Sequence, residues 1–126
     1  MSNLASATPV AFIITTDAAV SRHFYAETLT LPLGKQDDFA VVYDLGNTIL
    51  RVTEVPGFVA SPHPALGWRV DDIGATVTAL SANGVAFTVY DGFGQDSLGI
   101  WTAPDGSAKV AWFPDPDGNI LSLTQS

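Results

Sequence analysis

The chain has 126 residues, of which 47% are hydrophobic, and this is enough for one domain with a packed core. Its formal net charge is −8 with only five Lys and Arg, so the chain would repel nucleic acid and an anionic membrane surface. The absence of cysteine excludes disulfides, thiolate metal ligands and cysteine nucleophiles. We therefore expect a single domain, residues 1–126, with no nucleic-acid or membrane partner.

The sequence predicts no membrane-spanning helix and no signal peptide. No stretch approaches the roughly 18 consecutive apolar residues that a membrane-spanning helix needs. The first residues also lack the basic start and apolar run of a signal peptide. We expect a soluble, cytoplasmic protein.

The first half of the chain predicts a strand, a helix and two further strands. A β-branched and aromatic run over residues 10–16 favours a strand, and Asp17 follows it as a helix N-cap. The helix is expected to continue to about Leu29. Its predicted buried face has helical spacing: Val20, Phe24 and Thr28. Turn residues then separate predicted strands over residues 39–45 and 48–55.

The second half repeats this order. A strand is predicted over residues 66–70, followed by Asp71 or Asp72 as N-cap and by a helix that stops at Asn83-Gly84. The helix has an apolar stripe made of Ile73, Val77 and Leu80. Further strands are expected over residues 86–90, 98–103, 109–113 and 119–124.

This internal repeat predicts two modules related by a pseudo-twofold. The modules cover about residues 8–55 and 65–126, and the Pro-rich residues 56–64 form the linker. Residues alternate between the two faces of a strand, so the apolar neighbours of Arg51 and Ser122 should face the helices. Arg51 and Ser122 should then lie on the opposite, concave faces and line a cavity.

Three segments carry a resemblance to a known family. They are "FYAETLTLPL" (residues 24–33), "GWRVDDIGATVTALSANGV" (67–85) and "FPDPDGNILSLTQ" (113–125). Together they resemble the vicinal oxygen chelate superfamily, which includes glyoxalase I, extradiol dioxygenases, fosfomycin-resistance enzymes and bleomycin-binding proteins. The resemblance covers Val10 to Gln125 and departs at Thr30, where the family usually has glycine.

The resemblance implies an α+β fold of two βαβββ modules, whose curved mixed sheet surrounds a cavity within the chain or across a homodimer. In glyoxalase-like members, four strand positions hold a divalent metal. They correspond here to Val10, Arg51, Ala65 and Ser122. None is a usual metal ligand, and a guanidinium cannot coordinate at all because it is permanently charged. We expect no metal and no cofactor.

A shifted metal site through His63 is the alternative. His63 lies two residues before Ala65, so in an extended strand the two would share a face. Pro62 and Pro64 flank His63, however, and this context is typical of a loop or strand edge with an exposed histidine. The other histidine, His23, is expected to be a half-buried residue on the first helix.

The candidate ligand-binding residues all lie on predicted strands. Their side chains are positively charged or aromatic, except for one polar hydroxyl. Arg51 and Arg69 fall within predicted strands, where each either pairs with a protein carboxylate or receives a carboxylate, phosphate or carbonyl oxygen of a ligand. Trp101 follows a Gly-rich stretch that is either a lid or an irregular hairpin connection. The full set is Arg51, Phe12, Arg69, Trp101, Ser122 and Tyr43.

Three functions remain open from the sequence. The first is a metal-free protein, similar to the bleomycin-binding branch, that sequesters an aromatic or anionic small molecule. The second is an enzyme of the same superfamily, which would act through Arg51 with Tyr90, Asp91 or Asp96, or through a shifted metal site. The third is a partner-binding module whose own side chains fill the cavity. No nucleophile constellation is visible.

Overall fold

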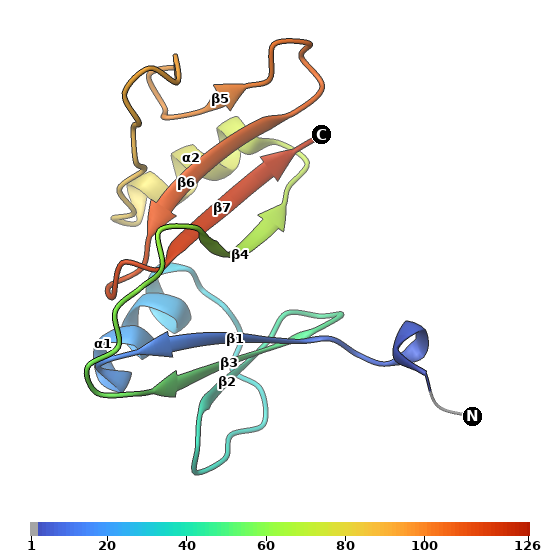
Figure 1. The fold of residues 1–126 in the computed structure, drawn as a ribbon, viewed down its shortest axis with the longest axis vertical. Coiled ribbons are helices and arrows are strands. Elements are labelled where there is room, and N and C mark those ends of the chain that lie inside the picture. Colours follow the sequence, from blue (N-terminus) through green and yellow to red (C-terminus); the bar gives the residue numbers. More distant parts are fainter. Residues whose placement is uncertain (1–2) are drawn as a thin grey trace. The chain divides into compact units, whose positions relative to one another are not determined.

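The computed structural model describes residues 3–126, which form two compact units that meet in sequence between Phe58 and Val59. Each unit contains one open, mixed β-sheet and a helical segment that follows the first strand of that sheet (Figure 1). This arrangement is the α+β fold of two modules that the sequence predicts. None of the helices in the described residues is long and apolar enough to span a bilayer.

The first unit has a three-stranded sheet. Its elements are η1 (Leu4–Ser6), β1 (Val10–Thr15), α1 (Ala18–Arg22), the π-helix η2 (His23–Thr28), β2 (Val41–Asp44) and β3 (Ile49–Glu54). The strand order is β1-β3-β2, with β1 parallel and β2 antiparallel to β3. The fourth strand of a βαβββ module is reduced to one bridge between Leu33 and Tyr43.

The first helix begins where the sequence predicts and buries a different face. The side chain of Asp17 accepts hydrogen bonds from the backbone N–H groups of Ala19 and Val20, which confirms it as the N-cap. The predicted stripe that starts at Val20 is wrong, because Val20 is 50% exposed while Ser21 and Tyr25 are buried. The helix presents the adjacent face to the sheet and widens into η2 at His23.

Thr30 follows this helix with φ of 59°, in the left-handed region that disfavours β-branched residues. Its hydroxyl donates to the carbonyl of Leu29 over 2.6 Å. We expect Thr30→Gly to raise the free energy of unfolding by about 1 kcal/mol, because glycine removes the steric cost and only part of this gain is lost to greater unfolded-state entropy. Urea denaturation measures it. Thr30→Ala removes the same hydroxyl and keeps a Cβ, so equal stabilisation by both variants would contradict the backbone explanation.

The second unit has a four-stranded sheet. Its elements are β4 (Pro64–Arg69), α2 (Ile73–Ala82), β5 (Trp101–Thr102), β6 (Lys109–Pro114) and β7 (Ile120–Gln125). The strand order is β4-β7-β6-β5, with β4 parallel to β7 and the other pairs antiparallel. Asp72, and not Asp71, caps α2 by accepting from the N–H of Ala75.

Two predicted strands of this unit need correction. Residues 86–90 form no strand; they are an irregular connection that reaches β6 through one bond from Thr88 N to the carbonyl of Trp112. The N–H of Tyr90 bonds to the side chain of Gln95 instead of a neighbouring strand. The strand expected over residues 98–103 is limited to β5.

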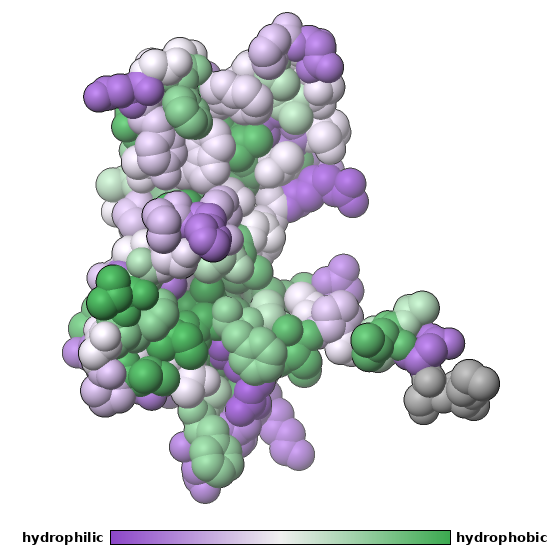
Figure 2. All heavy atoms as spheres, in the orientation of Figure 1, coloured by the Kyte–Doolittle hydropathy of each residue, from purple (hydrophilic) through white to green (hydrophobic). Residues whose placement is uncertain are grey.

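Each sheet packs one face against its helix and leaves the other face open. In the first unit, Leu50 and Val52 of β3 are buried on the helix side, together with Tyr25. In the second unit, the helix-side core consists of Ile73, Val77, Ala111, Phe113, Leu121 and Leu123. Figure 2 shows hydrophobic residues gathered over the strands of the first unit. Alternation along β3 and β7 therefore leaves Arg51 and Ser122 on the open faces, as the sequence predicts.

Candidate functional site

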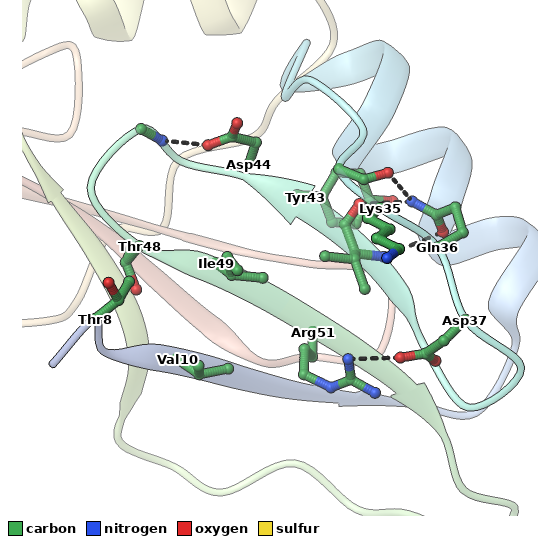
Figure 3. Close-up of a pocket in the computed structure, with 13 residues that line it drawn as sticks. Thr8, Val10, Lys35, Gln36, Asp37, Tyr43, Asp44, Thr48, Ile49 and Arg51 are labelled. Atoms are coloured by element: carbon green, nitrogen blue, oxygen red, sulfur yellow. Dashed lines mark hydrogen bonds and ion pairs between the residues drawn. The ribbon is translucent and has the colours of Figure 1, made fainter.

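A pocket of about 590 Å³ lies on the open face of the first sheet (Figure 3). Val10, Val42 and Ile49 supply its apolar lining. Its polar lining consists of Thr8, Lys35, Gln36, Asp37, Asp44, Thr48 and Arg51. The pocket is thus a partly apolar hollow with convergent polar groups, which is the usual character of a small-molecule site.

The strand register explains why these side chains meet. Arg51 of β3 lies opposite Phe12 of β1 and Val42 of β2, and residues directly opposite each other point to the same face. Val10 and Ile49 form the next such pair along β1 and β3. Phe12 is 64% exposed, so a large aromatic surface lies beside Arg51 on this open face.

Arg51 is held at the pocket by Asp37. Its Nη1 lies 2.7 Å from Oδ2 of Asp37, and the two side chains are 28% and 37% exposed. Figure 3 shows the two groups pointing toward one another. The hydrogen bond from Arg51, followed by the backbone N–H of Phe39, lowers the pKa of Asp37 to about 2. Asp37 is therefore ionised at neutral pH, and Arg51 is paired with a protein carboxylate through one guanidinium nitrogen, Nη1.

The loop that carries Asp37 is fixed in two ways. Oδ1 of Asp37 accepts hydrogen bonds from the N–H groups of Phe39 (2.8 Å) and Ala40 (3.0 Å), so the carboxylate is part of its own turn. The side chain of Gln36 donates to the carbonyl of Val42 and accepts from the backbone N–H of the same residue. These two bonds occupy the outer edge of β2. These bonds hold residues 34–37 over the sheet as a wall of the pocket.

Tyr43, although it borders the pocket, has its ring on the helix side of the sheet. The residue is fully buried, and its ring packs against Tyr25 with centroids 5.8 Å apart. Its hydroxyl is buried and has no hydrogen-bond partner among residues 3–126, and burial raises the pKa of this phenol. In this structure Tyr43 is thus a core residue whose ring does not face the space beside Arg51.

The other three predicted site residues lie on the open face of the second sheet. Ser122 lies opposite Gly67, and a Cβ at Gly67 would come within 2.5 Å of the Ser122 Oγ. Arg69 is exposed and forms no ion pair within residues 3–126. Trp101 is partly buried and lies opposite Val110 at the β5 edge. The structure therefore brings together Arg51 and Phe12 in one unit and places Arg69, Trp101 and Ser122 in the other.

The Gly-rich stretch before Trp101 is an irregular connection tied together by its own side chains. The amide of Gln95 donates to the carbonyls of Thr88 (2.9 Å) and Gly99 (2.7 Å). Oδ1 of Asp96 accepts from two N–H groups of the same stretch, so this candidate acid or base has a structural role in the turn. Three aromatic rings contact one another beside it: Tyr90, Phe93 and Trp112.

A family model described as the glyoxalase/bleomycin resistance protein/dioxygenase superfamily matches residues 7–123. The chain belongs to this superfamily. Among curated proteins, no relative was matched.

Several solved structures resemble the chain in fold. A glyoxalase family protein from Enterococcus faecalis is 19% identical, with a TM-score of 0.73 over 96% of this chain and 98% of that one. A lactoylglutathione lyase from Agrobacterium tumefaciens is 14% identical, with a TM-score of 0.71 over 96% of this chain and 94% of that one. The antibiotic-binding protein TnmS3 from Streptomyces sp. CB03234 is 24% identical, with a TM-score of 0.66 over 95% of each chain.

The residues at the metal positions of glyoxalase-like superfamily members do not fit a divalent ion here. The side chains of Val10 and Ala65 have no donor atom, and the guanidinium of Arg51 is already paired with Asp37. Ser122 offers only a neutral hydroxyl. His63 is exposed just before β4, and residues 3–126 contain no cluster of three His, Asp or Glu side chains suited to a metal. We therefore derive no chemistry through a metal.

Sequence reasoning missed most of the polar wall of the pocket. Lys35 and Asp37 are not among the predicted site residues, yet both line the pocket with Arg51. Val10 was considered only as a metal position, and it is part of the apolar lining. The adjacent acids Asp37 and Asp38 before β2 were the available signal, because a strand arginine needs a carboxylate within reach.

Proposed function

We propose that this superfamily member is a metal-independent small-molecule binding protein, which holds an aromatic or anionic ligand in the pocket beside Arg51. The observation that carries the proposal is a guanidinium fixed at the wall of a partly apolar pocket of about 590 Å³. A pocket of this size and lining suits a small planar molecule with one polar end. Homodimer formation and the absence of nucleic-acid and membrane partners remain predictions.

The physical roles follow from the lining. Val10, Val42 and Ile49 would contact the apolar body of the ligand, whose burial provides the main driving force. Arg51 would bind a ligand oxygen through guanidinium N–H groups that the single contact from Nη1 to Asp37 does not use. Phe12, exposed on the same face, would supply a flat aromatic surface. Similarity to an antibiotic-binding protein in fold supports a binding role for such a scaffold.

The proposal is tested by thermal-shift screening of planar compounds, followed by isothermal titration calorimetry with 2-naphthoate. We expect saturable binding of one molecule per chain that is unchanged by EDTA, because no step depends on a metal. Binding that requires an added divalent ion would contradict metal independence. If no planar compound binds at millimolar concentration, the binding function itself is wrong.

A further inference from the structure

The pocket beside Arg51 contains charges of both signs. Lys35 and Arg51 contribute two cations, and Asp37 and Asp44 contribute two carboxylates. The guanidinium of Arg51 is not an isolated cation at the pocket, because Oδ2 of Asp37 lies 2.7 Å from its Nη1. Any ligand oxygen bound by Arg51 would therefore lie close to a fixed negative charge.

Asp37 is built into this position. Its Oδ1 accepts two backbone N–H groups of its own turn, and its Oδ2 accepts from Arg51. A carboxylate held on both oxygens cannot rotate away without breaking these bonds. The same bonds fix the direction in which Arg51 presents its remaining donors, so Asp37 both orients the guanidinium and stays beside it when a ligand arrives.

We infer that Asp37 determines the ligand class of this pocket by limiting the charge of the ligand to zero or one negative unit. The inference rests on the proposed function and deepens it. Asp37 cancels much of the attraction that Arg51 exerts on a negative charge, so the pair leaves little net attraction to offset the desolvation of a second negative charge on the ligand. A phenol, a carbonyl compound or a carboxylate fits this balance, and a phosphate monoester, dianionic above its second pKa of about 6, does not.

The test uses three compounds with the same ring system: 2-naphthol, 2-naphthoate and 2-naphthyl phosphate. Calorimetry at pH 8 compares the wild type with Asp37→Asn, which keeps an oxygen for the two backbone N–H groups and removes the charge. We expect the wild type to bind the phosphate at least tenfold more weakly than the carboxylate. In Asp37→Asn this gap should shrink at least tenfold, because the repelling charge is gone.

Asp38→Asn is the matched control, since it removes the same charge from the neighbouring position and Asp38 does not line this pocket. In Asp38→Asn, the ratio of the affinity for 2-naphthoate to the affinity for 2-naphthyl phosphate should stay within about threefold of the wild-type ratio. The role of Asp37 would be overturned if Asp37→Asn left this affinity ratio unchanged, or if Asp37→Asn and Asp38→Asn changed it equally. Asp37→Ser, which also keeps an acceptor oxygen, replaces Asp37→Asn if the latter does not fold. Failure of all three compounds to bind either protein would instead overturn the proposed function.

Discussion

Replacing Asp115 with alanine is expected to lower the free energy of unfolding by about 3 kcal/mol. Asp115 is only 5% exposed and organises the turn before β7. Its Oδ1 accepts from the N–H groups of Asp117 and Asn119, each over 2.9 Å, and its Oδ2 accepts from the side-chain amide of Asn119. Alanine would leave these donors without their acceptor in a buried turn, which costs far more than the loss of an exposed bond.

Urea denaturation followed by circular dichroism measures this difference. Asp105→Ala is the control, because Asp105 lies in a comparable turn but is exposed, and its hydrogen bonds with the backbone N–H and side chain of Ser107 are open to solvent. We expect this control to cost less than about 1 kcal/mol. Equal losses in the two variants would show that burial of the Asp115 network does not govern the stability of this turn.

Arg51→Ala is expected to weaken the binding of 2-naphthoate by roughly 10- to 100-fold, the range for losing a hydrogen bond to a charged group. The affinity of Arg51→Lys for 2-naphthoate should lie between those of the wild type and Arg51→Ala, because lysine keeps the charge and loses the planar set of donors. The free energy of unfolding should change little, since the ion pair with Asp37 is partly exposed and such pairs contribute at most about 1 kcal/mol. Calorimetry and urea denaturation on the same samples separate the two effects.

The control for Arg51 is Lys109→Ala, which removes one positive charge from an exposed position in the second unit. Its affinity for 2-naphthoate should stay within about twofold of the wild type. Unchanged affinity in Arg51→Ala would exclude Arg51 as the ligand anchor. A large stability loss together with unchanged affinity would favour a module whose own side chains fill this space.

The parts of the fold that were predictable depend on local rules. Asp17 and the aspartate pair before α2 are recognised as caps because a short polar side chain can accept the first free N–H groups of a helix. Arg51 and Ser122 were placed on the open faces because side chains alternate along a strand. These rules need only neighbouring residues, so one sequence is sufficient.

The errors arose where a side chain from a nearby loop replaced a strand partner or tied down a turn. Residues 86–90 have strand-forming side chains, yet Gln95 takes the hydrogen bonds that a neighbouring strand would provide. The ion pair between Asp37 and Arg51 depends on the amide of Gln36 holding a loop over β2. These contacts depend on individual side chains in a loop, and the periodicity of strands and helices carries no signal for them.

The most direct test of the binding site is a titration of ¹⁵N-labelled protein with 2-naphthoate, followed by amide chemical shifts. The account predicts saturable shifts at the backbone of the pocket, above all at Val10, Lys35, Asp37, Ile49 and Arg51. Amides of the exposed helix face, such as that of Glu27, should not move. Shifts confined to the second unit, residues 59–126, would contradict the assignment of the site to the open face of the first sheet.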